Sequence, residues 1–143
     1  MGFTPDHMSC ILRACGKSFS VDRFLAKTKL KPCAVYRKGE PRFKTKPKGK
    51  KNTQSGINII VSNADFDQLD RSIKETIRFL RKHRSDIQQL VQFPGQSRPE
   101  LDFGIETRPV IVQGDRFPAE LLKLAGDLGL GIMVSRYPKK CDE

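Results

Sequence analysis

Residues 56–82 determine the fold, and they read GINIIVSNADFDQLDRSIKETIRFLRK. In the first part, Ile57, Ile59 and Val61 recur at every second position, which is the period of a β-strand. Further along, apolar residues return at the three- and four-residue steps of one helix face. These residues are Leu69, Ile73, Ile77 and Leu80. The stretch therefore predicts a buried strand, then a long helix over 66–83 that packs across a sheet through its apolar stripe.

The residues before this stretch predict two strands and one helix. Residues 8–15 are mostly apolar and read as the first strand. Over 21–30 the apolar residues follow helical spacing, and Pro32 prevents the helix from continuing. Residues 33–36 form a short second strand.

The residues after the stretch predict five further elements. A short helix is expected over 87–93, ended by a Pro-Gly pair. Strands are expected at 100–106 and 110–112, followed by a helix over 118–128 and a last strand at 132–134.

The main elements follow the order β-α-β-β-α-β-β-α-β, and the first six match a split βαβ arrangement. We therefore predict an α+β fold of the ferredoxin-like kind, with a mostly antiparallel sheet and helices on one face. The length of 143 residues suits a single domain, which we place at 8–138. Residues 1–7 are expected to be a leader from a cloning junction or disordered, and 139–143 a polar tail.

Positive charge is concentrated in one segment. The chain carries a formal net charge of +11, and Lys27–Lys51 holds eleven basic residues against the single acid Glu40. A chain that needed charge only for solubility would intersperse it. Residues 41–56 contain two prolines, two glycines and little apolar content, so we predict a mobile loop. Such a loop is either an electrostatic arm for phosphates or a solvated loop without a ligand.

The candidate residues for binding a polyanion come from this segment and from one face of the long helix. A basic stripe on a helix is most often only its hydrated side, so the helix residues are the weaker candidates. The candidates in the first segment are Arg37, Lys38, Arg42, Lys44, Lys46, Lys48, Lys50 and Lys51. Those on the helix are Arg71, Lys74, Arg78 and Lys82.

No catalytic or metal-binding pattern is present. The carboxylates of Glu100, Asp102 and Glu106 alternate with apolar residues of a strand, so they are expected to face outward without a catalytic role. Four cysteines without a CxxC pair, and only two histidines, predict unpaired thiols that bind no metal. We therefore expect no enzyme activity and no cofactor.

Two kinds of partner fit these observations. The first is nucleic acid or another polyanion, bound through the lysine-rich loop. The alternative is an acidic protein, bound by a protein-interaction or immunity-type module through a sheet edge or groove. No apolar run is long enough to cross a bilayer, so no membrane partner is expected, and free thiols favour the cytoplasm.

Short motifs stand near both ends of the chain. Near the start, the helix Val21–Leu30 is followed by Pro32 and the step Arg37-Lys38-Gly39. Near the end, the helix Pro118–Leu128 is followed by Ser135-Arg136-Tyr137. In these motifs the chain resembles a small bacterial family, the domain of unknown function 4279. The resemblance implies an α+β fold and a bacterial cytoplasmic origin, and it supplies no catalytic residue. The chain departs from the family by having no tryptophan near Ile57 and by its lysine-rich loop.

Overall fold

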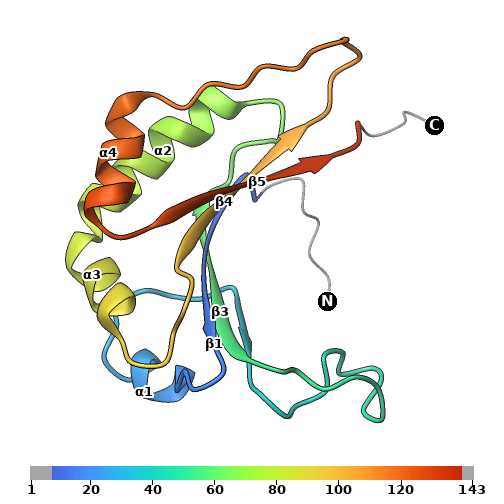
Figure 1. The fold of residues 1–143 in the computed structure, drawn as a ribbon, viewed down its shortest axis with the longest axis vertical. Helices are drawn as coiled ribbons and strands as arrows, with labels where there is room; N and C mark the ends of the chain where they lie inside the picture. The colour runs from blue at the N-terminus through green and yellow to red at the C-terminus, as the bar shows by residue number, and fades with distance from the viewer. Residues whose placement is uncertain (1–7, 140–143) are drawn as a thin grey trace.

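The computed structural model describes residues 8–139, and these form an α+β fold (Figure 1). The predicted leader, residues 140–143 of the tail and Cys141 lie outside the described residues. The elements in chain order are β1 (Cys10–Gly16), α1 (Val21–Leu25), β2 (Ala34–Tyr36), β3 (Ser55–Ser62), α2 (Leu69–Lys82), α3 (Arg84–Gln92), β4 (Glu100–Glu106), α4 (Ala119–Asp127) and β5 (Gly131–Tyr137).

The five strands form one mixed sheet in the order β2-β3-β1-β4-β5. β1 is antiparallel to both β3 and β4, and β2 is antiparallel to β3. β5 is parallel to β4, because α4 carries the chain back across the sheet between them. The α+β class is thus confirmed, whereas the sheet is mixed: β4 and β5 are parallel, and the other three neighbouring pairs are antiparallel.

The core lies between the sheet and the helices, which cover one side of it (Figure 1). Leu12 of β1, Ile59 of β3 and Leu101 of β4 are buried there, on alternate positions of their strands. The apolar stripe of α2 faces the same core: Ile73 and Leu80 are buried, and Leu69 and Ile77 are partly buried against it. The long-helix prediction is therefore confirmed.

The first helix is shorter than predicted and ends at Leu25 instead of Leu30. The reason is a distant carboxylate. Asp86 of α3 accepts hydrogen bonds from the Thr28 hydroxyl (3.2 Å) and from the Lys29 backbone N–H (3.0 Å). These bonds draw the chain out of helical geometry before Pro32 is reached.

The prediction of a strand at 110–112 is wrong. These residues lie in the loop between β4 and α4, and Val110, Ile111 and Val112 are all exposed. The loop is closed below them by polar contacts: Gln113 donates to the Glu106 carbonyl at 3.1 Å. With the helix predicted over 87–93 present as α3, the observed order is β-α-β-β-α-α-β-α-β.

The side of the sheet away from the helices carries polar and aromatic contacts. Asp102, predicted to face outward, is only 5% exposed, because Arg13 and Ser135 both donate to it. Beside it, the rings of Phe66 and Tyr137 stack at 4.4 Å across Gly104, where a Cβ atom would lie 2.5 Å from the Phe66 ring. Glycine at 104 is what permits this stack.

None of the helices in residues 8–139 combines the length and apolar character needed to cross a bilayer.

Candidate polyanion-binding surfaces

The lysine-rich segment forms a projection that we call the basic arm (residues 37–54), between β2 and β3. Its two limbs are joined by backbone hydrogen bonds: the Gly39 N–H to the Asn52 carbonyl, the Asn52 N–H to the Glu40 carbonyl and the Arg42 N–H to the Lys50 carbonyl, all 2.8–2.9 Å. Figure 1 shows the arm extending beyond the end of the sheet. Ser55 and Gly56, assigned to the loop from sequence, belong to β3. The mobility predicted for 41–56 stays a prediction.

The base of the arm is fixed to the domain. Arg37 makes a two-point contact with Asp22 of α1, at 3.2 Å from Nε and 2.7 Å from a terminal nitrogen. These hydrogen bonds hold the pKa of the Asp22 carboxyl below its ordinary value and raise that of Arg37. The Lys38 backbone N–H also donates to the Ser55 hydroxyl at 2.9 Å. Arg37 is therefore a structural residue of the arm, and its charge is already matched.

Beyond the base, the cations of the arm are not neutralised. Arg42, Lys44, Lys46, Lys48 and Lys50 are exposed, and none forms an ion pair with another residue of the described chain. Lys51 Nζ donates to the Pro47 carbonyl at 2.8 Å, a contact that leaves its charge uncompensated. Clustered cations without carboxylate partners are what a phosphate polymer requires. One aromatic side chain accompanies them, Phe43, which is 56% exposed.

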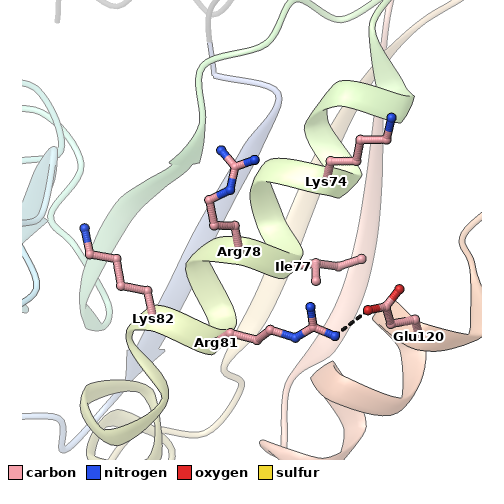
Figure 2. A pocket seen from close by; sticks show the side chains of 6 residues that line it. All are labelled: Lys74, Ile77, Arg78, Arg81, Lys82 and Glu120. Atoms are coloured by element: carbon pink, nitrogen blue, oxygen red, sulfur yellow. Dashed lines mark hydrogen bonds and ion pairs between the residues drawn. The ribbon is translucent and has the colours of Figure 1, made fainter.

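A second basic surface lies on α2, in an open groove of about 620 Å³ beside α4. Figure 2 shows the side chains that line it: Lys74, Ile77, Arg78, Arg81, Lys82 and Glu120. The guanidinium of Arg81 pairs with the Glu120 carboxylate of α4. Within the described chain the remaining three cations, Lys74, Arg78 and Lys82, form no ion pair. The groove thus presents three free positive charges and a fourth held by an acid.

Of the four helix candidates, three line this groove and one does not. Arg71 instead pairs with Glu75 one turn along α2, at 3.4 Å. Arg81 was not among the candidates, although its position three residues after Arg78 puts it on the same face. Glu120 had no signal in the sequence, because it reaches the groove from α4, 39 residues further along.

The arm and the groove are not brought together. The arm extends from the β2–β3 end of the sheet, whereas α2 lies on the helix-covered side, away from the arm (Figure 1). The two surfaces are therefore separate candidates, and the arm is the more heavily charged.

The thiols occupy structural positions. Cys10 is fully buried, and burial raises its pKa to about 12, so it stays protonated. Cys15 and Cys33 are partly buried, and all three are free. Among residues 8–139, no three histidine, cysteine or carboxylate side chains lie close enough to hold a metal ion together.

The sequence profile of the family named domain of unknown function 4279 matches residues 6–139. The match spans most of the chain, including the basic arm, so the chain belongs to this family, as its two ends suggested. A search of curated proteins and a search of solved structures each found no significant match.

Proposed function

We propose that this protein binds a polyanion, nucleic acid in particular, through the basic arm. The observation that carries the proposal is the run of exposed cations from Arg42 to Lys51, which have no carboxylate partner in the described chain. Each cation that meets a phosphate releases a condensed counterion, and this release supplies most of the free energy of non-specific binding.

The form of the arm supports this role. Its limbs are joined by backbone hydrogen bonds and its base is held by the Asp22–Arg37 pair, so the lysines are presented together on one projection. A ligand then meets several charges at once, and less conformational entropy is lost on binding than with an unstructured tail.

The α2 groove is a secondary surface for the same chemistry. Lys74, Arg78 and Lys82 are free to meet phosphates, while the Arg81–Glu120 pair reduces the local positive potential. We expect the groove to contribute less than the arm.

The proposal is tested by fluorescence anisotropy with labelled single- and double-stranded DNA and RNA at low salt. In the arm variant, Lys44, Lys46, Lys48, Lys50 and Lys51 are replaced by Gln. The matched control replaces five exposed lysines elsewhere, Lys17, Lys27, Lys29, Lys123 and Lys139. Both variants lose five positive charges, so a difference in their affinities reports a localised binding site.

We expect the arm variant to lose about tenfold or more in affinity and the control to lose much less. Equal losses would show that only the overall charge matters. No binding of the parent to any of these nucleic acids would overturn the proposal and favour the alternative, an acidic protein partner recognised by a protein-interaction or immunity-type module.

Three further assignments belong to the proposal. We infer a relationship to ferredoxin-like folds, supported by the antiparallel order β2-β3-β1-β4 within the sheet. A non-enzymatic role fits the absence of a recognised catalytic motif in the sequence. A bacterial, cytoplasmic protein is the setting that the resemblance implies.

A further inference from the structure

Two exposed apolar residues of the described chain, Met133 and Val134, lie in the edge strand β5. Of seven large hydrophobic side chains that are exposed, five lie in β5 or in the loop before α4. They are Val110, Ile111, Val112, Met133 and Val134. The loop begins beside the end of β5, where the Thr107 N–H donates to the Tyr137 carbonyl at 2.9 Å. Most of the exposed apolar side chains of the described residues thus belong to β5 and to the loop that starts at its end.

β5 is the last strand of the sheet, and within the described residues no strand pairs with its outer edge. It is seven residues long, has no proline or lysine, and pairs with β4 without a break in register. Proteins usually protect such edges with a short strand, a bulge, a proline or charged side chains. Arg136 is the one charged residue of β5, so most of this edge is open to pairing with a further strand.

The charges of the chain favour a second copy as that partner. The strongly basic segment Lys27–Lys51 lies around β2 and the arm, at the opposite edge of the sheet from β5. Two copies that met along β5 would therefore keep their strongly positive edges far apart. β5 itself contains one charged residue, Arg136.

The sequence of β5 is also compatible with pairing to itself. In an antiparallel pair centred on Val134, that residue faces its own copy and Met133 faces Ser135. Arg136 then faces Ile132, so no like charges lie directly opposite one another.

We propose that the protein forms a symmetric dimer through the outer edge of β5, centred on Val134, which joins two five-stranded sheets into one. The inference is independent of the proposed function, although such a dimer would carry one basic arm at each end.

The test is the molar mass in solution, measured by light scattering over a concentration series. The parent is expected at twice its 16.2 kDa chain mass. Val134→Lys puts two like charges opposite each other and should give a monomer. The matched control is Phe43→Lys. It also replaces an exposed apolar residue with lysine, but at the other end of the sheet, and it should stay dimeric.

A charge exchange keeps the test decisive if a single variant is poorly folded. Val134→Glu alone should also be monomeric, and an equimolar mixture of Val134→Lys with Val134→Glu should recover the dimer. Met133→Lys, on the neighbouring position of the same strand, should weaken the dimer as well. A parent that stays monomeric up to about 1 mM, or a dimer that survives Val134→Lys, would overturn the proposal.

Discussion

The side chain of Arg13 on β1 donates to the carboxylate of Asp102 on β4, at 3.0 Å between Nε and Oδ2. The other carboxylate oxygen accepts from the Ser135 hydroxyl on β5 at 2.7 Å. One buried acid therefore joins three adjacent strands on the side of the sheet without helices. It also spans the boundary between the antiparallel and the parallel parts of the sheet.

Replacing Asp102 with Ala should lower the free energy of unfolding by about 1–3 kcal/mol. The cause is the loss of two hydrogen-bond partners in a buried position, moderated because Arg13 is partly exposed and can be hydrated. Chemical denaturation measures the change. Glu100→Ala, which removes a less buried acid from the same strand, is the control and should change stability far less. Equal effects of the two replacements would show that the network contributes nothing.

Replacing Ile73 with Ala should cost about 2–5 kcal/mol, because its side chain is buried in the core under α2. The melting temperature should fall clearly. Leu122→Ala removes an aliphatic group of the same size at a half-exposed site on α4 and should cost much less. A melting temperature unchanged by the Ile73 replacement would contradict the packing of α2.

Stability should decline at alkaline pH, partly because of Cys10. Burial raises its pKa from 9.0 to about 12, so folding favours the neutral thiol. That contribution is complete below pH 9 and is lost as the pH rises toward 12. Burial also raises the pKa of Tyr36 from 10.0 to about 12, and this group acts in the same direction. The free energy of unfolding should therefore fall less steeply with pH in Cys10→Ala; parallel pH profiles would exclude the thiol as a cause.

Replacing Glu120 with Gln should strengthen polyanion binding, provided that the α2 groove takes part. The change releases Arg81 and removes the acid that, among residues 8–139, lines the groove. An exposed ion pair contributes about 0.2–1 kcal/mol, so the affinity should rise by roughly 1.5- to 5-fold. Asp67→Asn, an exposed acid outside both the arm and the groove, controls for the change in net charge. Anisotropy at low salt measures both, and an unchanged affinity in Glu120→Gln would assign no role to the groove.

The best-predicted elements are those whose apolar residues recur with a period that fits only a strand or only a helix. Over 56–82 the change from a two-residue to a helical period locates β3 and α2 without reference to the rest of the chain. The tripeptide Val110–Val112 has strand-forming residues but is too short to show a period, and its polar neighbours close it into a loop instead.

Contacts between distant residues account for the remaining differences. In the alternating pattern of β4, Asp102 takes a position on the side opposite the apolar core. Its burial is explained only by the positions of Arg13 and Ser135, which both donate to it. Similarly, Asp86 ends α1 from another helix, and Glu120 completes the groove from α4. Composition alone predicts the position of the arm, because its basic residues are consecutive in the sequence. It does not predict the backbone hydrogen bonds that join the two limbs of the arm.

The salt dependence of nucleic-acid binding tests the central claim most directly. For the parent, the logarithm of the affinity should fall linearly with the logarithm of salt concentration, with a slope of about −0.9 for each phosphate neutralised on duplex DNA. The variant with Lys44, Lys46, Lys48, Lys50 and Lys51 replaced by Gln should show a slope shallower by about 0.9 for each lysine that contacts a phosphate. Its melting temperature should barely change, since exposed charges contribute little to stability. Identical slopes for parent and variant would contradict the assignment of the binding site to the basic arm.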